Sequence, residues 1–265
     1  MSIPMAILND LTKCLGCRSC QVACKAWNHL PGLETSNRGS YENPPKLTYD
    51  TWTRIRFVET QREGRLEWVF SKRQCMHCLD PACVAACPEN ALSKTPSGPV
   101  IYDRSRCVGC RECGRACPYG FPRFEHTSDP RMGKCFMCAD RMAVGMAPAC
   151  SHACPNGALL FGPREEMLAQ AKERLKRDPA KYVAHIYGEK EAGGGSMLIL
   201  SPIPFAQLGL PALGEKSVAR LAPYPLLPAS PLSLGVVAVV GGVRWISRRR
   251  EAIRQNLSAK CQDVD

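Results

Sequence analysis

The chain has 265 residues, of which 45% are hydrophobic and 22% are charged, and its formal net charge is +11. This length is enough for about two domains with a modest core. The basic excess would suit a nucleic acid or a membrane surface. No aromatic platform or groove-reading motif accompanies it, which argues against nucleic-acid binding.

Short strands and runs of cysteine alternate over the first two thirds of the chain. A strand over Met5–Asn9 leads into the first cysteine run, and a strand over Val100–Tyr102 leads into the third. This order of elements predicts a ferredoxin-like α+β fold.

A hairpin is predicted between the first two runs. Thr53–Glu59 alternates apolar and polar residues, Arg65–Phe70 follows it, and Gln61–Gly64 reads as the turn. We expect Trp52 and Trp68 to pack there as core residues.

The last hundred residues change in character. Arg164–Asp178 predicts a charged helix with no chemistry of its own. Gly193–Gly195 then precedes an apolar stretch, Ser196–Ser201. Because its apolar residues need burial, we expect residues 164–227 to form a helix and an extended arm that packs on another subunit.

A membrane anchor is predicted near the C-terminus. Leu221–Val243 has no charged residue, and as a helix it would span about 34 Å. Four prolines between positions 223 and 231 delay the start of that helix. We therefore expect a single transmembrane helix over residues 228–247, with Trp245 at the interface. The alternative is an amphipathic or buried helix at an interface with a soluble partner.

The flanking charges orient this anchor in the cell inner membrane. Two basic residues, Lys216 and Arg220, precede the apolar stretch, and six follow it. The six are Arg244, Arg248, Arg249, Arg250, Arg254 and Lys260. The positive-inside rule then predicts a cytoplasmic tail over 248–265, which contains Cys261, and a periplasmic head. No signal peptide is visible in Met1–Met5, so export would depend on a partner's signal.

Sixteen of the 17 cysteines lie in four runs, and their spacing carries the function. The runs are Cys14-x2-Cys17-x2-Cys20-x3-Cys24, Cys75-x2-Cys78-x4-Cys83-x3-Cys87, Cys107-x2-Cys110-x2-Cys113-x3-Cys117 and Cys135-x2-Cys138-x11-Cys150-x3-Cys154. The first and third have the spacing of a bacterial ferredoxin half-site, in which three thiolates hold one cluster and the fourth cysteine reaches another. Four runs predict four 4Fe–4S clusters and a role in electron relay.

Two other uses of cysteine are less consistent with this pattern. A disulfide scaffold suits a short secreted chain, whereas this chain is long and has an odd number of cysteines. Zinc prefers two Cys-x2-Cys hooks across a longer loop, so it stays an alternative only for the irregular fourth run. Pro88, Pro118 and Pro155 follow fourth cysteines as in ferredoxins, and Lys25 departs from that pattern without affecting a ligand.

The ferredoxin pattern also predicts how the cysteines are shared, because paired runs exchange their fourth cysteines. The inner clusters would be held by Cys75, Cys78, Cys83 and Cys117, and by Cys107, Cys110, Cys113 and Cys87. The outer clusters would be held by Cys14, Cys17, Cys20 and Cys154, and by Cys135, Cys138, Cys150 and Cys24. An inner module over residues 74–123 would thus be inserted in an outer module made of residues 1–73 and 124–163.

The clusters change the charge argument. Each oxidised cluster with four thiolates carries about −2, so four clusters reduce the net charge to roughly +3. The arginines around the third run either raise reduction potentials or form a solvated face, and both interpretations stay open. They are Arg104, Arg106, Arg111 and Arg115. His77, inside the second run, can hydrogen-bond a cluster sulfide.

Longer phrases around the cysteines identify a family. They are CLGCRSCQVACKAWN (14–28), GRLEW (64–68), CMHCLDPACVAACP (75–88) and CADRMAVGMAPACSHACPNGALLFG (138–162). With the C-terminal anchor, they make nearly the whole chain resemble the iron–sulfur (beta) subunit of membrane-bound respiratory formate dehydrogenase. Segment 185–205 is also similar to the hydrogenase-associated subunit of the same group.

The resemblance implies partners and a non-catalytic role. A separate catalytic subunit with molybdopterin and Mo or W would oxidise formate. Electrons would pass through the four clusters of this chain to haem b or quinone in a membrane subunit. The chain itself contains no pterin-binding segment, haem-ligand pair or nucleophile arrangement. The alternatives are the same relay in a NiFe hydrogenase or in a sulfur-compound or dimethyl sulfoxide reductase, and a soluble polyferredoxin carrier.

Overall fold

The computed structural model describes residues 3–36, 39–62, 64–124 and 132–221, which belong to one compact unit. The predicted membrane helix (228–247) and cytoplasmic tail (248–265) lie outside the described residues. Within them, no helix combines the length and apolar character needed to cross a membrane.

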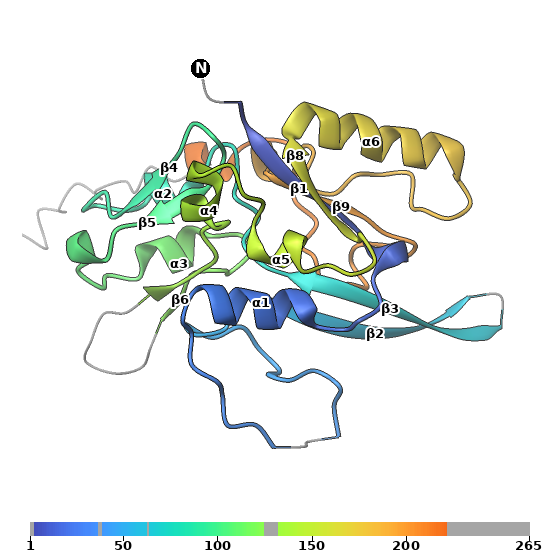
Figure 1. Cartoon of the computed structure of the whole chain (residues 1–265). Coiled ribbons are helices and arrows are strands. Elements are labelled where there is room, and N and C mark those ends of the chain that lie inside the picture. The colour runs from blue at the N-terminus through green and yellow to red at the C-terminus, as the bar shows by residue number, and fades with distance from the viewer. Residues whose placement is uncertain (1–2, 37–38, 63, 125–131, 222–265) are drawn as a thin grey trace, which may run out of the picture. The chain divides into compact units, whose positions relative to one another are not determined.

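A three-stranded sheet joins distant parts of the chain (Figure 1). Its order is β8 (Leu159–Pro163), β1 (Met5–Asp10) and β9 (Met197–Leu200). The central strand β1 pairs antiparallel with β8 and parallel with β9. From Ala6 onward β1 is buried, which agrees with its nearly continuous apolar sequence.

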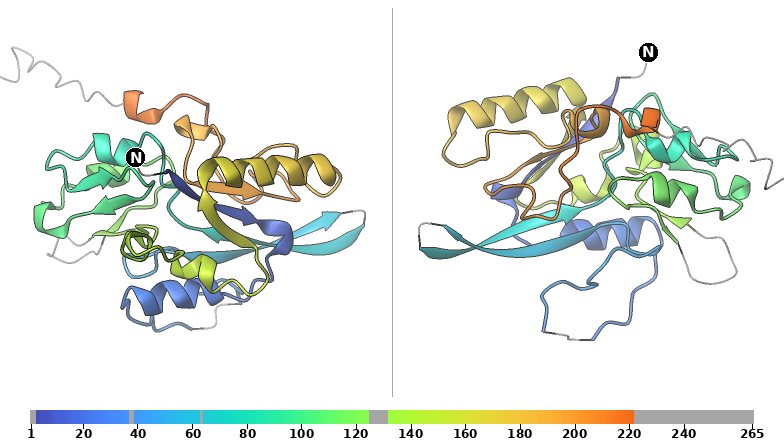
Figure 2. Two further views of the ribbon diagram at one scale, coloured as in Figure 1. Left: turned by 45° about the horizontal axis from the view of Figure 1, so that its top comes forward. Right: turned by 180° about the vertical axis from the view of Figure 1, so that it is seen from behind.

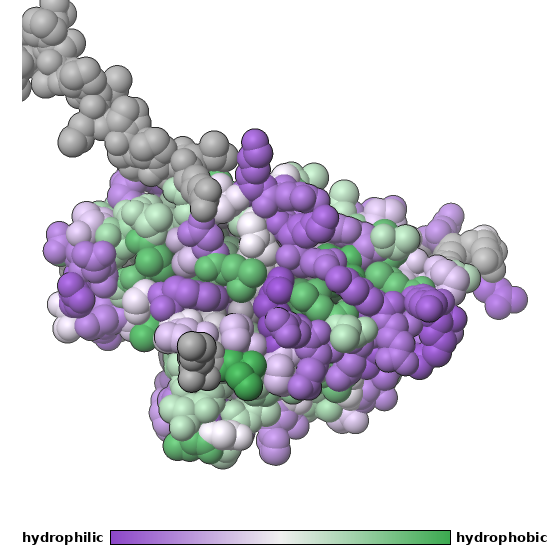
Figure 3. Space-filling model, turned by 90° about the horizontal axis from the view of Figure 1, so that it is seen from above, coloured by the Kyte–Doolittle hydropathy of each residue, from purple (hydrophilic) through white to green (hydrophobic). Residues whose placement is uncertain are grey.

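Helix α6 (Arg164–Arg177) covers one face of this sheet (Figures 1 and 2). Met167 and Ala171, four residues apart and therefore on the same side of the helix, pack on Ala6, Leu8 and Leu198. The molecule viewed from above presents a largely hydrophilic surface interrupted by small apolar areas (Figure 3). The helix expected over Arg164–Asp178 is thus confirmed.

Strand β9 corrects our expectation for Ser196–Ser201. We expected this stretch to lie in an arm against another subunit, but Met197–Leu200 is a strand of the chain's own sheet and is at most 2% exposed. Its register with β1 places Leu198 opposite Leu8. The apolar residues therefore obtain their burial inside this chain.

The predicted hairpin is present and longer than expected. β2 (Arg54–Arg62) and β3 (Arg65–Arg73) pair antiparallel from Arg54–Arg73 to Arg62–Arg65, so the turn is shorter than Gln61–Gly64. Trp52 is partly buried in the core, as expected. Trp68 is 36% exposed and meets the edge of Tyr41, so the expectation that it is a core residue is wrong.

The segment from the second to the third run repeats the design of the N-terminus. β4 (Leu92–Lys94) pairs with β5 (Val100–Tyr102), and a 3₁₀ helix, η2 (Arg104–Arg106), leads into Cys107. In the same way β1 is followed by η1 (Leu11–Lys13) and Cys14. Asp10 and Asp103 cap these two 3₁₀ helices by accepting the backbone N–H two residues later.

Short helices lie within the cysteine runs, and all of them except the one over Ala139–Ala143 contain a cysteine. They are α1 (Ser19–Trp27), α2 (Ala82–Ala85), α3 (Glu112–Ala116), α4 (Ala139–Ala143) and α5 (Ala149–His152). The proline after the fourth cysteine cannot continue a helix, so α2, α3 and α5 are short. In the first run Lys25 replaces that proline, and α1 runs on to Trp27. The Lys25 Nζ donates to the carbonyls of Pro31 and Asp50.

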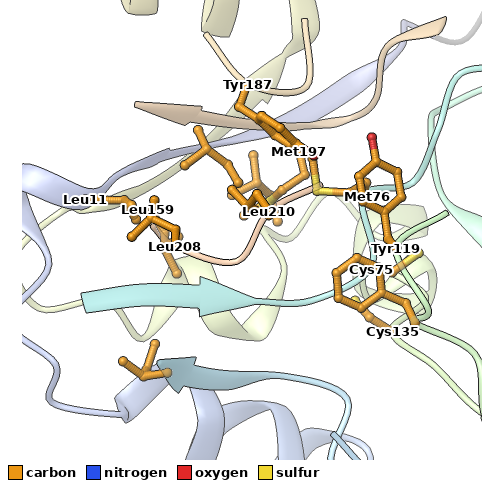
Figure 4. Close-up of a cluster of buried hydrophobic side chains, with 14 of the residues drawn as sticks. Leu11, Cys75, Met76, Tyr119, Cys135, Leu159, Tyr187, Met197, Leu208 and Leu210 are labelled. Carbon is orange, nitrogen blue, oxygen red and sulfur yellow. The ribbon is translucent and has the colours of Figure 1, made fainter. Parts of the chain in front are cut away.

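The remaining elements are small. β6 (Arg123–Phe124) pairs with β7 (Met132–Gly133), and two further 3₁₀ helices are η3 (Glu191–Gly193) and η4 (Val218–Leu221). The core includes the cysteines themselves: Cys75 and Cys135 lie in the largest buried cluster together with Tyr119 and Tyr187 (Figure 4). The fold is α+β, as expected.

Candidate metal centres

Each cysteine run begins with the same tight turn. The residue before the second cysteine has a positive φ in all four runs: 66° at Gly16, 48° at His77, 72° at Gly109 and 55° at Met137. A left-handed residue at this point reverses the backbone between two cysteines, so that their sulfurs can converge. At Gly16 the Phe70 ring also lies 2.8 Å from the place a Cβ would take.

The first predicted outer group of cysteines surrounds a cavity. Cys14, Cys17, Cys20 and Cys154, which we name the outer exposed set, together line this small cavity. Cys17 is exposed and Cys20 is buried, so one corner of this site reaches the surface. α1 supplies Cys20, and the turn after α5 supplies the fourth cysteine.

The inner group that includes the third run has the same arrangement. Cys87, Cys107, Cys110 and Cys113, the inner exposed set, line a small cavity. Cys110 is exposed and Cys113 is buried. The backbone N–H of Ala91 donates to the Sγ of Cys87 over 3.2 Å. Such N–H groups stabilise thiolate charge.

The second outer group lies in the interior. Cys24, Cys135, Cys138 and Cys150, the outer buried set, are all buried. Burial raises the pKa of the Cys24 thiol to about 12, with further contributions from Cys150 and Cys138. Burial likewise raises the pKa of Cys138, and Cys150 contributes there too. These electrostatic effects require the sulfurs to be neighbours.

In the second inner group two cysteines, Cys75 and Cys83, are buried and the other two are partly buried. Cys75, Cys78, Cys83 and Cys117 form the inner buried set. Burial raises the pKa of the Cys78 thiol to about 12, and nearby Cys75 and Cys117 add to the shift. Burial also raises the pKa of the Cys83 thiol, and the neighbouring Cys75 and Cys117 add to this shift.

In the predicted grouping, the four sets follow one another in a line. Cys20 and Cys24 share α1, which joins the two outer sets, and Cys83 and Cys87 flank the end of α2, which joins the two inner sets. Cys135 of the outer buried set lies near Cys75 of the inner buried set (Figure 4). The line therefore has two buried sets in the middle and a partly exposed set at each end.

The grouping of the sixteen cysteines into these four sets stays a prediction. All sixteen predicted cysteines lie in the described residues, and no disulfide joins them there. The identity of each cluster ligand stays a prediction.

A buried lysine tests whether the sites fit anionic clusters. Lys72, on β3, is 3% exposed and lines the cavity of the outer exposed set. Its Nζ has no hydrogen-bond partner among the described groups. Burial acts to lower the Lys72 pKa, but the cysteines of both outer sets raise it overall, Cys150 and Cys20 foremost. An unpartnered buried ammonium is costly unless negative charge lies beside it, and thiolate-ligated clusters supply that charge.

Two more lysines accompany the inner buried set. Lys134 is buried, and its Nζ donates to the carbonyls of Val100 (2.5 Å) and Cys135 (2.7 Å). Lys94 donates to the carbonyl of His77 over 3.0 Å. Burial lowers the pKa of Lys94 to about 8, against the opposing effect of Cys78 and Cys75.

Sequence reasoning missed these three lysines. The one available signal was Lys72 itself, a charged residue that follows the predicted strand Arg65–Phe70 and lies three positions before a cysteine run. His77 was predicted to hydrogen-bond a cluster sulfide. The structure places its Nε2 3.4 Å from the Sγ of Cys135, a cysteine of another run. The arginines around the third run are exposed.

Comparisons with known proteins agree with this chemistry. Residues 13–91 and residues 66–164 each match the 4Fe-4S dicluster domain. The iron-sulfur subunit of the nitrate-inducible formate dehydrogenase of Escherichia coli (strain K12) is 40% identical over 193 residues, which are 72% of this chain and 65% of that protein. The formate dehydrogenase-O iron-sulfur subunit of the same organism is 43% identical over 172 residues, 64% of this chain and 57% of that protein.

A hydrogenase relative is similar over a longer stretch. The hydrogenase-2 operon protein HybA of Escherichia coli O157:H7 is 36% identical over 246 residues, which are 80% of this chain and 74% of that protein. By contrast, the chain spans less than two thirds of the length of these formate dehydrogenase subunits, 65% of one and 57% of the other.

These observations define an iron–sulfur protein that carries two dicluster modules and sixteen cysteines for four 4Fe–4S clusters. The chain belongs to the family of dicluster ferredoxin-like iron–sulfur subunits that includes those of formate dehydrogenases and HybA. As a member of that family it is an electron-transfer subunit of an oxidoreductase complex, not its catalytic subunit.

Proposed function

We propose that this chain is the electron-transfer subunit of a membrane-bound formate dehydrogenase. It relays electrons from a catalytic subunit with a Mo or W pterin cofactor to a membrane subunit that carries haem b or reacts with quinone. The formate dehydrogenase subunits of Escherichia coli have the higher identities to this chain, 40% and 43%.

The observation that carries the proposal is the line of four cysteine sets. 4Fe–4S clusters held by thiolates accept and pass on single electrons. The two middle sets are shielded by the core, whereas Cys17 and Cys110 are exposed at the two ends. Leu15 and Val108, each 62% exposed, lie within these end loops. Each end thus offers an apolar surface of the kind that a partner subunit covers.

We assign the sixteen ligands as the four sets named above. In this assignment the inner module (74–123) is inserted in the outer module (1–73 and 124–163). Pairing of β1 with β8 supports it, because that pairing closes the outer module around the inserted segment.

We also propose that residues 228–247 anchor the complex in the inner membrane, with a periplasmic head and a cytoplasmic tail. The support is the uncharged stretch and the six basic residues beyond it. Extraction of membranes at alkaline pH tests it: an anchored subunit stays in the pellet and needs detergent. Release of the intact chain into the supernatant would contradict the anchor.

Relay in a hydrogenase complex is the second candidate. It is favoured by the similarity to HybA, which covers more of both chains than the formate dehydrogenase matches do. The two candidates differ only in the donor.

Low-temperature EPR of the oxidised, detergent-purified complex separates them. Formate and hydrogen are added to separate samples, and dithionite to a third that serves as the fully reduced control. Reduced-cluster signals with formate but not with hydrogen support the formate dehydrogenase assignment. Signals with hydrogen alone would refute it and place the chain in the hydrogenase branch.

A further inference from the structure

His77 occupies a position where two of the four runs have glycine. It precedes the second cysteine of its run, as Gly16 and Gly109 do, and its φ of 48° is left-handed. A residue with a side chain is strained in this conformation. Met137 also accepts it, and there the side chain fills the apolar core. His77 is polar and 0% exposed, so packing alone does not account for it.

Both ring nitrogens of His77 have partners. The backbone N–H of Val100 donates to Nδ1 over 3.0 Å. Because Nδ1 accepts, a neutral ring carries its proton on Nε2. Nε2 lies 3.4 Å from the Sγ of Cys135, so the imidazole donates to that sulfur. The Val100 contact thus fixes both the ring orientation and the direction of the second hydrogen bond.

The two ends of this contact belong to different cysteine sets. His77 lies between Cys75 and Cys78 of the inner buried set, whereas Cys135 belongs to the outer buried set. The Sγ of Cys135 also accepts the backbone N–H of Met137 over 3.3 Å. The imidazole is therefore the side-chain donor to this sulfur, and it reaches across the junction of the two modules.

We propose that His77 is a positioning residue that raises the reduction potential of the cluster in the outer buried set and couples that cluster to its inner neighbour. A hydrogen bond to a thiolate ligand withdraws electron density from the cluster, which stabilises the reduced and more negatively charged form. The proposal rests on the ligand sets assigned above and is independent of whether the donor is formate or hydrogen.

The test is a redox titration of the purified complex with chemical mediators, followed by EPR. His77→Phe keeps an aromatic ring of similar size and removes the donor, and His77→Gln restores an N–H donor. We expect His77→Phe to lower the reduction equilibrium constant of one cluster at least tenfold, which is about 59 mV for a one-electron couple. His77→Gln should recover much of this shift, and the inner exposed cluster should stay unchanged as the internal reference.

His77→Gly is a control for the case in which His77→Phe prevents the loop from folding. Glycine is native at the equivalent positions 16 and 109, so this variant relaxes the backbone while it removes the donor. It should retain the iron content of the native complex and show the same lowered potential as His77→Phe. Unchanged potentials in His77→Gly with full iron content would overturn the proposal, as would equal shifts for Phe and Gln.

Two cysteine variants distinguish failure of this proposal from failure of the ligand assignment. Cys135→Ser and Cys150→Ser should perturb the same EPR signal, and that signal is the one expected to shift in His77→Phe. If the two cysteine variants perturb different signals, the assignment of the outer buried set is wrong. If they agree and the signal keeps its potential in the His77 variants, only the role of His77 is refuted.

Discussion

Lys72→Met is the substitution that most directly tests the electrostatics of the outer sets. Lys72 is 3% exposed, lines the cavity of the outer exposed set and interacts with cysteines of both outer sets. Methionine fills a similar volume without the charge, so the change removes an ammonium and leaves little cavity. Since a positive charge stabilises the reduced cluster, both outer potentials should fall.

Coulomb's law gives the size of this effect. A unit charge about 8 Å from a cluster centre, at an effective dielectric constant of about 20, contributes about 2 kcal/mol. For a one-electron couple this corresponds to about 90 mV. The shift should be larger in the outer buried set than in the outer exposed set, because solvent near exposed Cys17 screens the charge.

The assay is a mediated redox titration followed by EPR, with two matched controls. Lys72→Arg keeps the charge and should keep both outer potentials close to native. Lys13→Met removes a lysine that lines the same cavity but is more exposed, and should produce a smaller shift. Unchanged outer potentials in Lys72→Met, or an equal fall in all four clusters, would refute the assignment of Lys72 as a local counter-charge.

Three further outcomes are expected. Cys154→Ser should damage the cluster held by Cys14, Cys17 and Cys20 and leave the inner EPR signals intact, whereas loss of an inner signal would show that the pairing is wrong. Removing iron with a chelator should lower the unfolding free energy of the native protein by about 3–5 kcal/mol more than it lowers that of the Lys72→Met variant, because the buried ammonium of the native protein then lacks its anionic neighbours. Urea unfolding measures both losses, and equal losses would contradict this expectation. Asp10→Ala should cost about 3 kcal/mol of unfolding free energy, since Oδ2 of Asp10 accepts from Arg174 (2.7 Å) and Tyr182 (3.0 Å) in the interior. Asp103→Ala, at the equivalent but exposed cap, is the matched control and should lose less; similar losses would refute the role of burial.

The cysteine sets could be anticipated because their geometry is local. Three ligands of each ferredoxin half-site lie within seven residues, and the positive φ at Gly16 and Gly109 closes the turn between the first two. The alternating pattern of Thr53–Glu59 was sufficient to predict the hairpin, because the two strands are neighbours in the sequence. In each case the interacting residues are neighbours in the sequence.

The missed features depend on contacts between distant segments. β9 has only four residues, and its partner β1 lies about 190 positions earlier, so no local pattern distinguishes it from an arm. Trp68 alternates correctly along β3, but its face of the hairpin meets Tyr41 near the surface rather than a core. The role of Lys72 as a counter-charge depends on cysteines of the first and fourth runs, which lie beside it only in the folded chain.

The distribution of basic residues refines the charge argument. The formal net charge of +11 suggested that basic residues balance the clusters, and the arginines of the third run were the obvious candidates. They are exposed, where water and salt screen them. Lys72 and Lys134 are instead buried, and Lys94 is partly buried, beside the outer and inner buried sets. We therefore expect these three lysines, rather than the surface arginines, to contribute most to the local field at the predicted cluster sites.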